Sequence, residues 1–381
     1  MQHVYAERAV IGTRLVEGVE LAINDSGVIE DVREAPGTPE PWLAGLVVVP
    51  GYVDTHCHGG AGTDFAADDA DGVAAAIEYH RRHGTTTLFA STVSESMDDL
   101  VDQVGRLRRL VEAGELDGIH LEGPFLALEK KGAHNPALLC DPTPERVERL
   151  LAAAGGTLRQ ITIAPERDHG LEAIATFSSH GVHAAFGHSD ADADITRASL
   201  AAGVTVATHL FNAMRSIHHR NPGPVPVLLV DHGDVLLELI CDGVHLNADI
   251  VRMAIDAAGV DRIALVTDAM SATGQADGDY DLGTLKVQVR SGVARLATDD
   301  GQPGAIAGST LTMASAFQFV VSQAGRSLVE AAQMAATNPA RHYGLDRVGA
   351  IEGGRRADLC AVTERGELVA VMRGGEWVRR P

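Results

Sequence analysis

The chain has 381 residues, 45% of them hydrophobic and 22% charged, which is enough for a large core and a second, smaller domain. The formal net charge of −21 argues against nucleic acid or an anionic membrane as a partner. The four cysteines form no CxxC pair, and neither a signal-peptide pattern nor a membrane-length apolar run is present. We therefore expect a cytoplasmic protein.

Both ends of the chain show the sequence pattern of short β-strands. Strand-like runs separated by turns, such as residues 24–27, fill residues 1–50, and similar runs return after residue 345. We expect residues 1–50 and 346–381 to pair in one small β-sandwich domain. A larger domain, residues 51–345, would then be inserted between them.

The middle of the chain alternates between apolar, β-rich runs and segments of helical periodicity. Counting the run that precedes His56, there are eight such runs. Eight strand–helix repeats predict an α/β fold, a (β/α)8 barrel of the TIM type. The expected strands are 46–49, 86–90, 119–121, 161–164, 182–186, 204–207, 236–240 and 263–266, and helices are expected at 72–83, 97–112, 144–153, 191–202 and 248–257.

Two segments exceed a minimal barrel. Residues 280–297 predict a hairpin with its turn at 290–292, placed after the last strand and so near the barrel mouth. Residues 126–135 form a long, charged loop after the third strand. Such a loop is suited to closing over a bound ligand.

Histidines and carboxylates follow five of the predicted strands, at the end of a barrel where active sites lie. His56 and His58, two residues apart, would project together from one strand end. Six titratable groups facing one mouth would repel or desolvate one another without a cation, so we predict a metal site. The six are His56, His58, Glu122, His188, His209 and Asp268.

Imidazole and carboxylate ligands suit Zn²⁺ or another divalent transition metal, such as Fe²⁺, Mn²⁺ or Co²⁺. None of the three lysines closes a predicted barrel strand, so Glu122 is the best bridge between two ions. We expect His56 and His58 on one ion, and His188 and His209 on the other. A single ion held by Glu122, His188 and His209 is the alternative.

Asp268 could also bind metal, but its expected role is proton transfer. It would take a proton from a water acidified by the metal and deliver it to the leaving amine. The structural alternative is a helix N-cap, where Asp is favoured.

Several segments resemble the amidohydrolase superfamily and, within it, the N-acetylglucosamine-6-phosphate deacetylase family. The resemblance covers nearly the whole chain. The most specific matches are Leu-Glu-Gly-Pro at 121–124, Lys-Gly-Ala-His-Asn-Pro at 131–136 and His-Leu-Phe-Asn-Ala-Met at 209–214. At the first strand this chain has His56-Cys57-His58, where many bacterial relatives carry Gln-x-Asn and hold one metal. This difference favours two ions.

The resemblance implies metal-dependent hydrolysis of the N-acetyl group of N-acetyl-D-glucosamine 6-phosphate, giving glucosamine 6-phosphate and acetate in amino-sugar catabolism or recycling. It also implies a homodimer in which Arg220 is lent to the phosphate site of the neighbouring subunit. His134 would lie near the N-acetyl group and polarise its carbonyl. The other implied substrate contacts are Ala133, Asn212, Ala213, His245, Ala307, Gly308 and Ser309.

Two other functions remain open from the residues. The first is an amidohydrolase acting on cyclic amides or N-acyl amino acids, against which Arg220 and the Asn212-Ala213 pair speak, because those substrates carry no phosphate. The second is a non-catalytic barrel that uses metal for structure or binding. Such a protein would be expected to lose Asp268 or some ligands, and this chain retains them.

Overall fold

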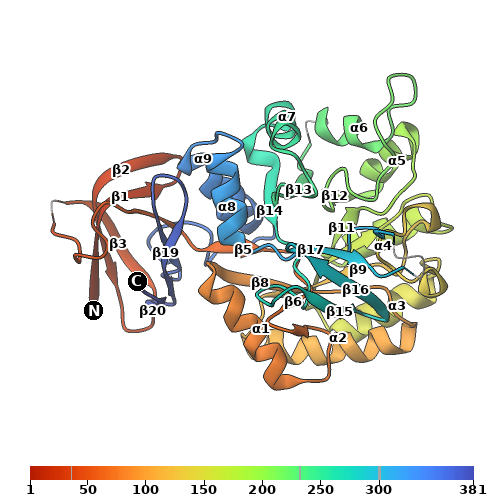
Figure 1. The fold of residues 1–381 in the computed structure, drawn as a ribbon, viewed down its shortest axis with the longest axis horizontal. Helices are drawn as coiled ribbons and strands as arrows, with labels where there is room; N and C mark the ends of the chain where they lie inside the picture. Colours follow the sequence, from red (N-terminus) through yellow and green to blue (C-terminus); the bar gives the residue numbers. More distant parts are fainter. Residues whose placement is uncertain (36, 231–232, 299–301) are drawn as a thin grey trace.

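The computed structural model describes residues 1–35, 37–230, 233–298 and 302–381. This described part contains an eight-stranded sheet, a seven-stranded sheet and two smaller sheets. Figure 1 shows the seven-stranded sheet at the left, together with both chain ends, and the eight-stranded sheet with its helices at the right.

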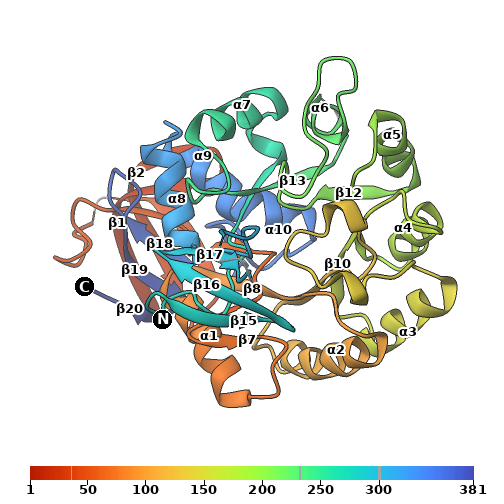
Figure 2. The ribbon, with the colours of Figure 1, turned by 45° about the vertical axis from the view of Figure 1, so that its right-hand side comes forward.

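The eight-stranded sheet is the predicted (β/α)8 barrel. Its strands lie in chain order, each parallel to the next. Figure 2 shows helices arranged around it. The strands are β5 (Tyr52–Asp54), β8 (Thr85–Thr92), β9 (Gly118–Glu122), β10 (Leu158–Ile163), β11 (His183–Phe186), β12 (Val204–Ala207), β13 (Leu236–Ile240) and β14 (Ile263–Val266).

All five predicted helices are present, with ends shifted by at most two residues. Side-chain caps begin several of them, as where Asp69 accepts from the Gly72 N–H. The α-helices are α1 (Ala70–Arg82), α2 (Met97–Glu112), α3 (Pro144–Ala154), α4 (Gly170–Ser179), α5 (Ala193–Ala202), α6 (Pro224–Val230), α7 (Ala248–Ala258), α8 (Met313–Ser322), α9 (Leu328–Ala332) and α10 (Asn338–His342). Shorter turns of helix are η1 (Leu128–Lys130), η2 (Pro136–Leu138), η3 (Val260–Arg262) and the π-helical η4 (Gln333–Thr337).

The predicted first barrel strand, residues 46–49, was wrong, because this run belongs to the other sheet. The apolar run forms β4 (Val47–Pro50) of the seven-stranded sheet, and the barrel begins with β5. The chain crosses between the sheets at Gly51, whose N–H donates to the Asp358 carbonyl at 2.9 Å. A Cβ at Gly51 would lie 2.4 Å from Thr86 Oγ1, so a larger residue does not fit there. The apolar sequence itself carries no sign of this boundary.

The seven-stranded sheet joins both chain ends in the order β20-β19-β18-β4-β1-β2-β3. The expected sandwich is here one hydrogen-bonded sheet, because the long β1 pairs with β2 on one edge and with β4 on the other. All seven strands fall within residues 1–50 and 346–381, and the domain boundaries themselves stay a prediction. The remaining strands are β1 (Gln2–Ile11), β2 (Arg14–Ile23), β3 (Ile29–Glu34), β18 (Leu359–Val362), β19 (Leu368–Arg373) and β20 (Glu376–Arg379).

The barrel closes just beyond its first and last strands. β5 and β14 are the two ends of the sheet order, and Cys57 forms a parallel bridge with Ala269. The Asp268 N–H donates to the His56 carbonyl and the His58 N–H donates to the Ala269 carbonyl, both at 2.8 Å. These bonds hold the first and eighth strand ends side by side.

The predicted hairpin at 280–297 is a three-stranded antiparallel sheet with two turns. It consists of β15 (Gly278–Leu282), β16 (Leu285–Arg290) and β17 (Val293–Leu296). Buried side chains such as Leu282 and Val287 pack on Met270, just after the last barrel strand. A short hairpin, β6 (Gly59–Gly60) and β7 (Thr63–Asp64), follows the first strand.

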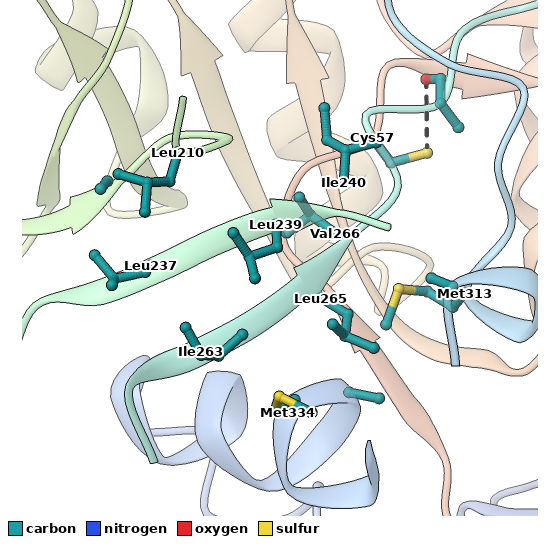
Figure 3. Packing of buried hydrophobic residues seen from close by; sticks show 14 of the residues in the cluster. Cys57, Leu210, Leu237, Leu239, Ile240, Ile263, Leu265, Val266, Met313 and Met334 are labelled. Carbon is teal, nitrogen blue, oxygen red and sulfur yellow. Dashed lines mark hydrogen bonds between the residues drawn. The ribbon is translucent and has the colours of Figure 1, made fainter. Parts of the chain in front are cut away.

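The barrel core continues from the strands to the surrounding helices. In Figure 3, Leu265 of β14 lies between Met313 of α8 and Met334 of η4. All three side chains are fully buried. No helix in the described ranges is both long enough and apolar enough to cross a membrane.

Replacing Leu265 by Ala should lower the free energy of unfolding by about 2–5 kcal/mol, because it leaves a cavity between two helices and the sheet. Denaturant unfolding followed by circular dichroism measures the loss. The matched control is Leu15→Ala on β2, whose side chain is 43% exposed and should cost much less. Equal losses for both variants would contradict this packing.

Candidate active site and metal centre

Three site residues directly follow barrel strands in a left-handed backbone conformation. His188, His209 and Asp268 have φ angles of 48°, 29° and 50°. Such angles are uncommon outside glycine, cost on the order of 1–3 kcal/mol, and cluster at functional sites. Here they turn the chain sharply at the strand ends, where the side chains meet.

Glu122, at the end of β9, is the centre of the cluster. Its Oε1 lies 2.8 Å from His209 Nε2 and 3.0 Å from His188 Nε2. Its Oε2 lies 3.2 Å from His58 Nε2, and His56 Nε2 is 3.7 Å from Oε1. All five side chains are buried. The predicted ligands therefore converge on one point, each imidazole through the same nitrogen.

Asp268 belongs to one half of this cluster. Its Oδ1 lies 3.2 Å from His58 Nε2 and 3.4 Å from His56 Nε2. The donors thus divide into His56, His58 and Asp268 on one side and His188 and His209 on the other. Glu122 lies between the two halves.

The Glu122 carboxyl is ionised in this setting. Burial raises its pKa, but while the neighbouring imidazoles carry protons on Nε2, the charge of His56 and hydrogen bonds from His134, His188 and His209 outweigh burial and hold the pKa of Glu122 well below its usual range. Its Oε2 faces His58 and its Oε1 faces His188 and His209, so this carboxylate is suited to bridging two cations.

Outer contacts set the tautomers of two imidazoles. His188 Nδ1–H donates to the Lys130 carbonyl at 2.8 Å, and His56 Nδ1 lies 3.3 Å from Glu238 Oε2. Both partners are acceptors, so each Nδ1 carries a proton, and Nε2 is the nitrogen that offers its lone pair to a cation once its own proton has left.

The Nε2 atoms of the cluster face one another at short range, and in the neutral form that binds metal their lone pairs would repel. The Nε2 atoms of His56 and His58 are 3.2 Å apart, and those of His188 and His209 are 3.1 Å apart. A cation between them removes this repulsion, and imidazole with carboxylate is the donor set of a divalent transition metal. The residues therefore fit a metal centre.

His134 has the opposite tautomer. The Ser94 backbone N–H donates to His134 Nδ1 at 3.2 Å, so the ring proton lies on Nε2, 3.4 Å from Glu122 Oε2. Burial lowers the pKa of His134 to about 4, which leaves the ring neutral at pH 7. This arrangement suits a hydrogen-bond donor rather than a metal ligand.

A cavity of about 320 Å³ opens above the cluster. Of the predicted substrate contacts, Ala133, Asn212, Ala213, His245 and Gly308 line it. The other three lie elsewhere: Ala307 is buried beneath the three-stranded sheet, Ser309 donates its N–H to the Asp268 carbonyl, and Arg220 is on an exposed loop of this chain. The role of Arg220 as a cation lent between subunits stays a prediction.

Lys130 lines the cavity and was not predicted as a site residue. It is the one lysine or arginine among the described lining residues, and its Nζ lies 3.4 Å from Asp190 Oδ1. Arg215 also binds Asp190, at 2.7 Å. The signal in the sequence was its place beside the Lys-Gly-Ala-His-Asn-Pro segment.

Two side chains beside the ligands, Cys57 and His120, are buried behind the cluster. Cys57 Sγ lies 3.4 Å from His80 Nε2, in a buried position, and Figure 3 shows it among apolar residues. His120, two residues before Glu122 on β9, packs edge-on against His56 with ring centroids 4.5 Å apart. Its nitrogens bond the hydroxyls of Ser91 and Thr162.

A (β/α)8 barrel with imidazoles and carboxylates at its strand ends is typical of metal-dependent hydrolases. Residues 47–378 match the Amidohydrolase family, and the chain belongs to this family.

Three similar proteins illustrate this membership. A mutant of N-acetyl-D-glucosamine-6-phosphate deacetylase from Mycobacterium smegmatis, solved in complex with N-acetyl-D-glucosamine-6-phosphate, is 45% identical with a TM-score of 0.92, covering 99% of both chains. N-acetylgalactosamine-6-phosphate deacetylase from Escherichia coli O157:H7 is 35% identical over 95% of both chains. N-acetylglucosamine-6-phosphate deacetylase from Vibrio furnissii is 31% identical over 94% of this chain and 90% of its own.

Replacing Glu122 by Gln should weaken metal binding by more than about tenfold, since even outer contacts of metal ligands are worth that much. Metal content after dialysis against graded chelator, read by mass spectrometry, measures the change. Glu129→Gln is the matched control, because Glu129 lines the same cavity on an exposed turn. Unchanged metal content in Glu122→Gln would contradict the site.

Proposed function

We propose that this protein hydrolyses the acetamide group of N-acetyl-D-glucosamine 6-phosphate, releasing acetate and glucosamine 6-phosphate in amino-sugar catabolism or recycling. The observation that carries this proposal is the cavity, which joins the imidazole–carboxylate cluster to His134, Asn212 and Ala213. The similarity to the Mycobacterium smegmatis enzyme supports the substrate.

We expect the cofactor to be a pair of divalent metal ions. Zn²⁺ is the first choice, and Fe²⁺, Mn²⁺ or Co²⁺ would suit the same ligands. His56 and His58 would hold one ion and His188 and His209 the other, with Glu122 between them. Bound there, the ions would supply Lewis acidity and a water acidified toward neutral pH.

Two residues would move protons and stabilise charge. His134 would donate its Nε2–H to the acetamide oxygen as negative charge develops on it. Asp268 would accept a proton from the attacking water and return it to the nitrogen as the C–N bond breaks. Water thus supplies the hydroxyl of the acetic acid and the proton of the amine, so the atoms balance.

The phosphate needs cations in a chain of net charge −21. Lys130 supplies one from the same subunit, and because Asp190 keeps Arg215 as a closer partner, Lys130 can turn toward the ligand. Arg220 of the neighbouring subunit supplies the second, with His245 and the Asn212-Ala213 pair beside it. The contacts proposed for the rest of the sugar are Ala133 and Gly308, which line the cavity, while the predicted contacts Ala307 and Ser309 are the buried neighbours of Gly308 in the chain.

The protein is proposed to be a homodimer and to act in the cytoplasm. Exposed apolar side chains flank the relevant loops: Ile217 precedes Arg220, and Leu128 and Val244 lie beside cavity residues. All four cysteines are free thiols, as a reducing compartment requires.

The galactosamine epimer is a second candidate substrate, favoured by the 35% identity to the Escherichia coli enzyme. The two sugars differ only in the orientation of one hydroxyl group, so the same cavity and catalytic groups could serve either.

Acetate release by the metal-loaded protein distinguishes these substrates. We expect kcat/KM for N-acetylglucosamine 6-phosphate to exceed that for N-acetylglucosamine by at least about a hundredfold, since two charge-assisted phosphate contacts are lost without the ester. N-acetylgalactosamine 6-phosphate should be the poorer ester. Faster turnover of the galactosamine ester would make N-acetylgalactosamine 6-phosphate the preferred substrate. No turnover of either ester would contradict the proposed function.

Mixed dimers test whether Arg220 acts in the active site of the neighbouring subunit. Asp268→Asn alone should retain metal and lose about 10²–10⁴-fold in kcat, and Arg220→Ala alone should bind the phosphate ester poorly. In a dimer of one subunit of each kind, one site has Asp268 and receives Arg220. Mixing should therefore restore up to about a quarter of wild-type activity. No recovery in dimers shown to exchange subunits would place Arg220 outside the site.

A further inference from the structure

Glu238 lies in the middle of β13, between Leu237 and Leu239, and is fully buried. A carboxyl group in the interior of a barrel is costly unless its oxygens are bonded and its charge is matched. Its ionisable partner is His56, at 3.3 Å. The position therefore calls for an explanation beyond packing.

One oxygen of Glu238 contacts both halves of the metal centre. Oε2 lies 3.3 Å from His56 Nδ1 and accepts the backbone N–H of His209 at 3.3 Å. The side chain of one ligand and the backbone of another are thus held by the same atom. The Leu210 N–H also donates to the Glu238 carbonyl at 2.8 Å, which anchors the turn at His209.

The other oxygen of Glu238 is held from the barrel interior. Oε1 accepts from Gln160 Nε2 at 3.0 Å and lies 3.5 Å from Thr55 Oγ1. The Tyr343 hydroxyl donates to Gln160 Oε1, which orients the amide so that its NH₂ group faces Glu238. Contacts to Oε1 from the barrel interior therefore fix the carboxyl group in place, and Oε2 faces the metal ligands.

We propose that Glu238 is a positioning residue that keeps His56 in its Nδ1–H tautomer and so retains the ion of the His56/His58 half. The inference rests on the metal centre of the proposed function and not on its substrate. A carboxylate behind an imidazole raises the basicity of that ligand and fixes its ring.

The two halves of the centre are supported unequally. His188 donates to a neutral backbone carbonyl, that of Lys130, whereas His56 faces a carboxylate. Loss of the Glu238 charge should therefore weaken the His56/His58 half selectively, because the amide oxygen of a glutamine can still accept the His209 backbone N–H. The His188/His209 half should keep its ion.

The test is a chelator titration of the metal-loaded full chain, with residual metal per subunit read by mass spectrometry. In Glu238→Gln, one ion should leave at a chelator concentration ten- to a hundredfold lower than in wild type, while the other leaves as before. The rise in melting temperature on adding Zn²⁺ to the metal-free protein should shrink in parallel.

Gln160→Leu is the matched control, because it removes a partner of the same carboxyl group without touching His56. It should melt earlier than wild type and shift metal release much less than Glu238→Gln, because Thr55 and the His209 N–H still hold the charged carboxyl group. An equal shift in metal release for both variants would reduce Glu238 to a structural role, and an unshifted Glu238→Gln would overturn the proposal.

Two further results are informative. A wild type with one ion, weakened by Glu238→Gln, would keep the positioning role and overturn the two-ion proposal. If Glu238→Gln does not fold, Glu238→Asp, which withdraws the carboxylate by one methylene group, undergoes the same titration. Wild-type metal release by that variant would overturn the proposal.

Discussion

The Nε2 atoms of the four predicted ligand histidines lie 2.8 to 3.7 Å from one buried carboxylate, and this convergence constrains the rest of the site. Buried lone pairs so close together are tolerated when a cation lies between them. The outer contacts follow from the same requirement: His188 and His56 are held with Nε2 free to bind. His134 is held the other way and keeps a proton there.

The barrel supplies this convergence through its strand ends. Parallel strands bring all their carboxyl ends to one mouth, and the bonds between Asp268 and His56 close the last gap in the ring. The loop after β9 then returns to the site, where a Cβ on Gly132 would lie 3.0 Å from His188. One loop thus carries the His134 donor, the Lys130 cation and the carbonyl that orients His188.

Much of this could be predicted from the sequence, because strand–helix alternation and the residues after each strand are local patterns. The missed boundary at Gly51 is different, since Val47 to Asp54 is apolar throughout most of its length and only tertiary pairing separates the two sheets. Glu238 was overlooked because its partners, His56 and Gln160, lie 182 and 78 residues away. The role proposed for Arg220 needs a second subunit, which no single chain displays.

The cluster is proposed to hold two ions bridged by Glu122. Anomalous diffraction from crystals of the zinc-loaded protein, recorded on both sides of the zinc absorption edge, tests it most directly. The account predicts two peaks about 3.5–4 Å apart, one at His56 and His58 and one at His188 and His209. A single peak at full loading, or a peak coordinated by His134 Nε2, would contradict it.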